Sequence, residues 1–172
     1  MNIESYRRIV ILGPAGSGKS WLAKKLAAST GYPIYHLDME FWKPGWVETP
    51  KEEWIARQEE LVRRESWIIE GTYASTLEIR YSAADLIILL DLNPLRCMWS
   101  AFRRHGKKRS DLPEYLEEHM NWEFVEFCGF ILDFRKKNVP KVLALRDKYP
   151  DKKLVILKSR REVSGFAEKC SL

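Results

Sequence analysis

The chain has 172 residues, of which 45% are hydrophobic and 31% are charged, and this composition is enough for one packed domain with a solvated surface. It excludes a disordered chain, a collagen-like repeat and a small protein held together by disulfides. The net charge of +5 favours a partner that carries phosphate, which a small nucleotide, a nucleic acid or an acidic membrane would each provide.

Apolar runs alternate with segments of helical periodicity along the chain. The apolar runs predict buried strands at residues 6–12, 33–37, 67–69, 86–90 and 154–157. The periodic segments predict helices at residues 19–28 and 51–64, a helix that begins at Pro94, and a long helical region before the last strand. This alternation predicts an α/β fold, in which helices cover both faces of a parallel sheet and ligands bind at the carboxyl ends of the strands.

A glycine-rich motif follows the first predicted strand. Residues 13–20 read Gly-Pro-Ala-Gly-Ser-Gly-Lys-Ser and match the pattern G-x-x-x-x-G-K-[ST] at every fixed position. Glycines let backbone N–H groups approach phosphate oxygens, the lysine brings positive charge to the β- and γ-phosphates, and the serine hydroxyl is a ligand for Mg²⁺. We therefore expect a nucleoside triphosphate with Mg²⁺, bound by Gly13, Pro14, Ala15, Gly16, Ser17, Gly18, Lys19, Ser20 and Trp21.

Other parts of the sequence narrow the class of phosphate-loop protein. The chain has no N-K-x-D sequence of the kind that GTPases use to recognise their base. The fourth predicted strand ends in Asp91-Leu92 rather than the Asp-Glu of motor ATPases, and the chain is short for that class. These features favour a small kinase, with acidic residues after the second and third strands and a flexible basic segment later in the chain.

Four blocks of the sequence are distinctive: the loop 13–20, His36-Leu37-Asp38 with the Trp-rich run 41–47, the block 67–73, and residues 158–163. Together they resemble the adenylate-kinase-related P-loop family often labelled DNA topology modulation proteins. The resemblance implies the three-layer nucleoside-monophosphate-kinase fold, with a five-stranded parallel sheet in the order 2-3-1-4-5. It also implies an acceptor-binding segment at about 39–66 and a helical lid at about 103–117, within one domain of residues 1–172. ATP is the implied donor, and the acceptor stays open.

Two acidic residues at predicted strand ends are candidates for the chemistry. We expect Asp38 to orient the acceptor hydroxyl, to take its proton or to hold a Mg²⁺-bound water; the alternative is a polar residue that caps the next segment. Glu70 stands where kinases of this kind usually carry Asp before Gly, and we expect it to hold Mg²⁺ through a water, together with Ser20. Gly71, the next residue, is expected on the acceptor side.

Basic residues are candidates for contacts with the phosphates and the base. The run 103–109 carries five cationic side chains and no acid, and in a lid its arginines would neutralise the transferred phosphoryl group. Arg103, Arg104 and Arg109, with Lys19, are therefore the expected catalytic cations, although a solvated basic loop is the alternative. Arg160 is expected near the adenine.

Further side chains are assigned to the acceptor. Arg80 is a candidate clamp, but it comes later in the sequence than the Arg of related kinases, which weakens the case for a nucleoside monophosphate and leaves an uncharged acceptor open. Trp42 and Trp46 predict either an aromatic acceptor pocket or ordinary core packing. The three histidines, including His36, are isolated in the sequence and are interpreted as structural or lid residues.

The favoured hypothesis is an ATP- and Mg²⁺-dependent phosphotransferase that acts on a small acceptor. The alternatives are a nucleotide-switched regulatory or DNA-binding protein and a slow ATPase that affects DNA topology. The chain shows no secretory signal, no apolar run long enough to span a bilayer and no paired cysteine motif. We therefore expect a cytoplasmic protein without a membrane partner, as a monomer or a homodimer.

Overall fold

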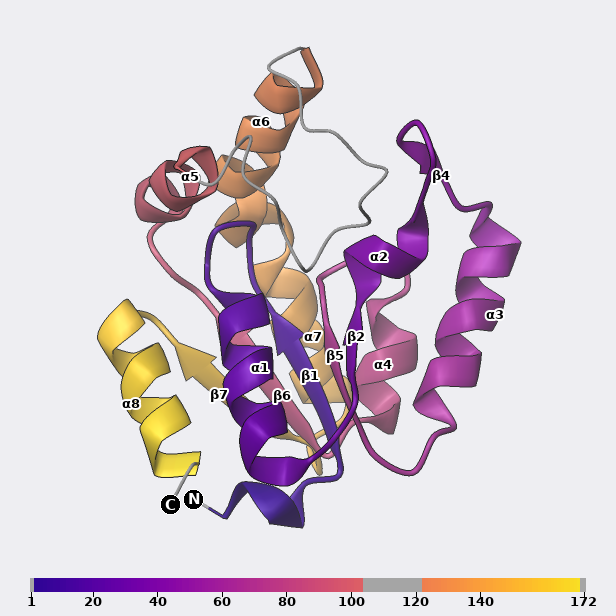
Figure 1. The fold of residues 1–172 in the computed structure, drawn as a ribbon, viewed down its shortest axis with the longest axis vertical. Coiled ribbons are helices and arrows are strands. Elements are labelled where there is room, and N and C mark those ends of the chain that lie inside the picture. Colours follow the sequence, from indigo (N-terminus) through magenta and orange to yellow (C-terminus); the bar gives the residue numbers. More distant parts are fainter. Residues whose placement is uncertain (1, 104–121, 171–172) are drawn as a thin grey trace.

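The computed structural model describes residues 2–103 and 122–170, and it is built around one parallel sheet (Figure 1). The strands of this sheet are β1 (Arg8–Leu12), β2 (Ile34–His36), β5 (Trp67–Glu70), β6 (Leu86–Leu90) and β7 (Lys153–Leu157). They lie in the order β2-β5-β1-β6-β7, with every neighbouring pair parallel. Counted along the chain within this sheet, that is the predicted order 2-3-1-4-5, so the predicted α/β fold is confirmed.

Helices cover both faces of the sheet. They are η1 (Ile3–Ser5), α1 (Lys19–Thr30), α2 (Leu37–Phe41), α3 (Lys51–Val62), α4 (Leu77–Ala83), α5 (Pro94–Phe102), α6 (Trp122–Lys137), α7 (Val139–Lys148) and α8 (Arg160–Cys170). Figure 1 shows α1 and α8 on the near side of the sheet. The side chains of α3, α4 and α7 pack against the opposite face.

The core forms two apolar layers because the strand side chains alternate between the faces. In β1, Ile9 and Ile11 pack with α1 and α8, whereas Val10 and Leu12 pack with α3, α4 and α7. All four are fully buried. Burial on both faces explains why the strands read as continuous apolar runs rather than as an alternating pattern.

The segment after β2 differs from the prediction. The strand expected at residues 33–37 ends at His36, and the chain turns at once into the short helix α2. A two-stranded antiparallel hairpin follows, formed by β3 (Trp42–Lys43) and β4 (Val47–Glu48) around Pro44 and Gly45. These elements and α3 occupy the expected acceptor segment. No helix within the described residues combines the length and the apolar character needed to cross a membrane.

Candidate active site

The glycine-rich loop joins β1 to α1 and packs tightly against α5. Gly16 has a φ of +75°, and a Cβ at this position would lie 2.1 Å from the carbonyl oxygen of Cys97 on α5. The loop is also closed on itself, because the Ser17 N–H donates to the Pro14 carbonyl at 3.2 Å. Only glycine combines this backbone conformation with such a close approach. The loop therefore has the shape that the motif predicts.

The interior of the loop offers donors for an anion. The Lys19 ammonium donates to the Pro14 carbonyl at 3.1 Å, within the loop itself. Ser17 is 1% exposed, and its hydroxyl has no hydrogen-bond partner in the described part of the chain. The helix α1 begins directly after Gly18. Its free N–H groups and the positive end of its dipole therefore point toward the interior of the loop. This loop fits a chain of phosphate groups.

Glu70 is the polar centre of the adjoining strand ends. It is 4% exposed, and its Oε1 accepts hydrogen bonds from Ser20 Oγ at 2.9 Å and from His36 Nδ1 at 2.7 Å. The contact with His36 follows from the sheet, in which His36 and Glu70 are register partners at the ends of β2 and β5, whereas Ser20 comes from the first turn of α1. Burial raises the pKa of the Glu70 carboxyl, but the hydrogen bond from His36, the charge of Lys19 and the hydrogen bond from Ser20 outweigh it and hold the pKa below its ordinary value.

The Ser20–Glu70 pair fits a magnesium ion. A hydroxyl and an ionised carboxylate, 2.9 Å apart and beside the phosphate loop, are the oxygen ligands that Mg²⁺ takes when it also binds phosphates. Within residues 2–103 and 122–170, no group of three or more His, Cys, Asp or Glu side chains is placed to hold a metal. Ser20 and Glu70 stay the candidate ligands, on the geometry of their contact.

Asp38 lies in the first turn of α2, next to a partly buried tyrosine. The Tyr73 hydroxyl donates to Asp38 Oδ1 at 2.7 Å. Burial, first, and then the neighbouring charge of Asp38 raise the pKa of Tyr73 well above its ordinary value, so the phenol stays protonated and remains a donor. The hydrogen bond from Tyr73 thus fixes the position of the Asp38 carboxylate, as a group that orients an acceptor hydroxyl would require.

An aromatic cluster surrounds this pair. The Tyr73 ring packs on Phe41 and Trp54, with ring centroids 4.8 and 5.1 Å away. Trp42 lies edge-on to Phe41 at 4.9 Å and to Trp46 at 5.4 Å. Trp54 belongs to the buried core, whereas Trp42 and Trp46 are half-buried in and beside the hairpin. The cluster therefore serves as core at Trp54 and as a partly open aromatic wall at the two hairpin tryptophans.

The turn after β5 contacts both the glycine-rich loop and α2. The Thr72 hydroxyl donates to the Gly13 carbonyl at 3.1 Å and accepts from the Gly13 N–H at 3.3 Å. Gly71, with a φ of +132°, lies so close to Leu37 that a Cβ would be 2.8 Å from the leucine Cβ. Consecutive residues 70–73 thus contact Ser20, Leu37, Gly13 and Asp38 in turn.

Arg80, the expected acceptor clamp, lies beneath this turn rather than in the cleft. It has no exposed surface, and its guanidinium donates to the Thr72 carbonyl at 2.6 Å and to the side chain of Gln58. Burial lowers the pKa of Arg80 to about 9, so the group is still charged at neutral pH. The structure does not bring Arg80 to the acceptor side; it braces the turn that carries Thr72.

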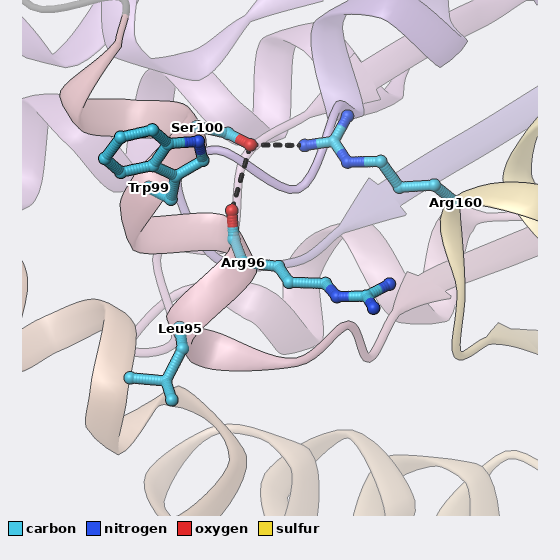
Figure 2. A pocket seen from close by; sticks show the side chains of 5 residues that line it. All are labelled: Leu95, Arg96, Trp99, Ser100 and Arg160. Carbon is cyan, nitrogen blue, oxygen red and sulfur yellow. Dashed lines mark hydrogen bonds between the residues drawn. The ribbon is translucent and has the colours of Figure 1, made fainter.

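A hollow lies beside the glycine-rich loop, between α5 and Arg160 (Figure 2). It has a volume of about 360 Å³ and is lined by Leu95, Arg96, Trp99, Ser100 and Arg160. Arg160 donates to the Gly16 carbonyl and to Ser100 Oγ, both at 2.8 Å. Trp99 is 62% exposed. A guanidinium and an indole at the end of the phosphate loop suit a flat base.

The remaining predicted site residues are more dispersed. Trp21 follows Ser20 on α1 but is 44% exposed, with the Lys25 ammonium 5.9 Å from its ring centre. Arg103 is exposed at the end of α5, the helix that lines the hollow. Arg104 and Arg109, and most of the expected lid at 103–117, lie outside the described residues.

Three residues at the site were missed or underrated in the sequence. His36 bonds the candidate metal ligand, Thr72 holds the loop, and Tyr73 holds Asp38. A signal existed for His36, because the order 2-3-1 makes its strand the neighbour of the one that ends in Glu70. No comparable signal marks Tyr73, since its partner is set by the turn conformation, in which Tyr73 itself has a φ of +33°.

Comparison with known proteins shows the fold. No family model and no curated protein matches the chain. Among solved structures, the chain is similar to shikimate kinase from Acinetobacter baumannii in complex with shikimate (TM-score 0.61, 15% identity, 97% of this chain and 92% of that chain). It is also similar to shikimate kinase from Bacteroides thetaiotaomicron (0.58, 18%, 95% and 96%) and to a gluconokinase from Sinorhizobium meliloti 1021 (0.54, 16%, 95% and 93%). The chain therefore has the P-loop kinase fold that these proteins share.

Proposed function

We propose that this protein transfers the γ-phosphoryl group of ATP, with Mg²⁺, to a hydroxyl group of a small acceptor. The observation that carries the proposal is the turn at residues 70–73, which joins three parts of a phosphotransfer site at one sheet edge. Glu70 bonds Ser20 of the phosphate loop, Thr72 bonds Gly13 at its start, and Tyr73 bonds Asp38 on the other side. Donor and acceptor groups are thereby held relative to each other, as phosphoryl transfer requires.

On the donor side, the loop N–H groups and Lys19 would bind the phosphates, and Ser20 with Glu70 would hold Mg²⁺. The metal would neutralise charge on the phosphate oxygens. Arg160 and Trp99 would contact the base in the hollow beside the loop. These assignments use the same edge of the sheet at which ligands of open α/β folds bind.

On the acceptor side, Asp38 would accept the hydrogen bond of the attacking hydroxyl and take its proton as the phosphoryl group moves. The hydrogen bond from Tyr73 at 2.7 Å keeps the carboxylate oriented. The roles of Arg103, Arg104 and Arg109 in neutralising the transferred group rest on the sequence of the basic run, as does the lid itself. Resemblance to the family labelled DNA topology modulation proteins is likewise a proposal from the sequence blocks.

The direct test measures ATP consumption and ADP formation with a panel of nucleosides and hydroxylated metabolites. Lys19→Ala should lose the transfer by about a hundredfold or more, because it removes a charge that faces the phosphates in the transition state. Lys24→Ala, an exposed lysine on the same helix, is the matched control and should keep it. Equal turnover in the two variants would refute the assignment.

The same preparation resolves the two alternatives. A DNA-binding protein would bind duplex DNA, with an affinity that falls steeply as salt is raised. A slow ATPase would release phosphate at a rate that no acceptor changes. Acceptor-dependent transfer without duplex binding is the result that the proposal predicts.

A further inference from the structure

Building on the proposed function, we infer that the acceptor is a hydroxylated molecule without an anionic group, either neutral or amine-bearing. This deepens the proposed function by naming the chemical class of the acceptor. It rests on two features of the expected acceptor segment. Most of its cations are paired with its own carboxylates, and the remaining groups are the Asp38 carboxylate and the rings of Trp42 and Trp46.

The acceptor side is acidic within a basic protein. Residues 38–66 contain eight carboxylates and five cations, although the chain as a whole carries a net charge of +5. Asp38 itself lies in this segment, and its carboxylate faces the Tyr73 hydroxyl. A phosphate or carboxylate on the acceptor would be repelled by the carboxylates of this segment.

The cations of this segment are engaged with its own carboxylates. Arg57 donates to Glu40 at 2.8 Å and to Glu60 at 2.6 Å, and these bonds raise its pKa above the ordinary value. The Lys43 ammonium, in the hairpin, lies 2.8 Å from Glu53. An anionic acceptor that recruited either cation would have to break a formed ion pair.

Two further arginines, which directly follow α3, also form ion pairs. Arg63 lies 3.9 Å from Glu59, and Arg64 lies 3.2 Å from Glu60 and also donates to the Tyr35 hydroxyl. Among the cations of residues 38–80, Lys51 is the one that forms no ion pair or buried hydrogen bond within the described part of the chain. Lys51 is exposed in the first turn of α3.

Arg80 cannot serve as the missing anion clamp without unfolding the turn above it. Its guanidinium is completely buried and donates to the Thr72 carbonyl and to Gln58. Turning it toward the cleft would leave that carbonyl and amide oxygen unpaired in the interior. It would also release Thr72, which holds Gly13 of the phosphate loop.

The groups that remain on the acceptor side suit a neutral or amine-bearing molecule. Asp38 accepts hydrogen bonds from hydroxyl or ammonium groups. The half-buried rings of Trp42 and Trp46, 5.4 Å apart, provide apolar faces for a sugar or base ring and attract an amine through the ring electrons. Shikimate is a carboxylate, and the described residues from 38 to 80 offer it no unpaired buried cation.

The test uses pairs of related acceptors of which one member carries an anionic group: adenosine and AMP, glucose and gluconate, and shikimate methyl ester and shikimate. Binding to the ADP-loaded protein is measured by calorimetry, and kcat/KM for transfer from ATP is measured alongside. In the pair that binds best, the member without the anionic group should be favoured by about tenfold or more. Preference for AMP, gluconate or shikimate over its partner, or binding of no neutral member, would overturn the inference.

A charge variant tests the physical cause. Glu53→Gln releases Lys43 beside Trp42 and should reduce the preference for the neutral member by about threefold or more. Glu78→Gln, which breaks the ion pair between α4 and Lys148 of α7, is the matched control and should leave it unchanged. If the two variants behave alike, the ion pairs of the acceptor segment are not its cause and the inference fails.

The two readouts separate this inference from the proposed function. If no acceptor receives a phosphoryl group, the proposed function is wrong, whereas the order of binding affinities still decides the class of ligand. If transfer occurs but the anionic members are preferred, the proposed function stands and the inference about the acceptor is wrong.

Discussion

Glu70 combines almost complete burial with an ionised carboxylate. Its charge is stabilised by the Ser20 hydroxyl at 2.9 Å, by His36 at 2.7 Å and by the nearby Lys19. A buried carboxylate with such partners is costly to neutralise and costly to leave without them. At the scale of single residues, this makes Glu70 the side chain on which magnesium binding should depend most.

Glu70→Gln should raise the Mg²⁺ concentration needed for half-maximal activity by about ten- to a hundredfold, because the amide keeps the size of the side chain but not its charge. Calorimetric titration of Mg²⁺ with ADP gives a second readout that does not need turnover. Asp91→Asn is the control, since Asp91 follows β6, which is separated from β5 by β1 in the sheet, and accepts a hydrogen bond from Arg135 at 2.6 Å. An unchanged magnesium requirement in Glu70→Gln would remove Glu70 from the metal site.

Tyr73→Phe should lower kcat for acceptor phosphorylation by about tenfold while the KM for ATP stays the same, because a hydrogen bond to a charged group contributes about 1.5–3 kcal/mol. The ring packing on Phe41 and Trp54 is kept in this variant. In an Asp38→Ala background the same change should have no further effect on kcat. Additive losses would show that Tyr73 does not act through Asp38.

Stability should depend on the same phenol at high pH. Burial raises the folded-state pKa of Tyr73 above its ordinary value of 10.0, so the stabilisation from the phenol is complete below about pH 10. Above that pH the unfolded chain loses the proton first, and the free energy of unfolding falls. Denaturation in urea should therefore show a constant difference between wild type and Tyr73→Phe from pH 7 to 9.5, and a shrinking difference above pH 10. A difference that grows above pH 10 would contradict this.

At the scale of elements, the phosphate loop is held from two sides. The helix α5 presses a backbone carbonyl against Gly16, and the turn after β5 bonds Gly13 through Thr72. Contacts of this kind keep the loop in its phosphate-binding shape before any ligand arrives, which reduces the entropy lost on binding.

Gly16→Ala should therefore lower the free energy of unfolding by about 3 kcal/mol and weaken ATP binding, because the added Cβ meets the Cys97 carbonyl at 2.1 Å in a left-handed conformation. The control is Gly165→Ala in α8, where nothing lies within 4 Å of the added Cβ. That change should raise stability by about 0.5–1 kcal/mol. Thermal unfolding and ATP titration of both variants measure the contrast; a tolerated Gly16→Ala would show that the loop is not held by α5.

The elements were predictable to different degrees for physical reasons. The central strands β1, β5 and β6 were recognisable because they are buried on both faces and so read as apolar runs, whereas the edge strands β2 and β7 are only partly buried. The helix α2 and its hairpin were not, because they depend on a five-residue turn of helix and on strands of two residues. The partners of Arg80 and Tyr73 come from tertiary packing at separations of 22 and 35 residues, which periodicity does not report.

At the scale of the whole molecule, charge is distributed unevenly along the chain. The chain is basic overall, yet the segment from Asp38 to residue 66 is acidic, so a single net charge of +5 describes neither end of the site. The predicted phosphate-binding groups lie with the loop and α5, and the predicted acceptor groups lie with α2 and the hairpin. A site arranged in this way would attract a nucleotide on one side and disfavour a second anion on the other.

We propose that the carboxyl ends of the strands hold a donor site and an acceptor site, which together perform phosphoryl transfer. The most direct measurement follows labelled γ-phosphate from ATP into an acceptor in wild type and in Asp38→Asn, with ATP binding measured in both. We expect Asp38→Asn to bind ATP as wild type does, to keep the Tyr73 hydrogen bond through its amide oxygen, and to lose transfer by about a hundredfold or more. Equal labelling of the acceptor in both proteins, or label that appears only as free phosphate in wild type, would contradict it.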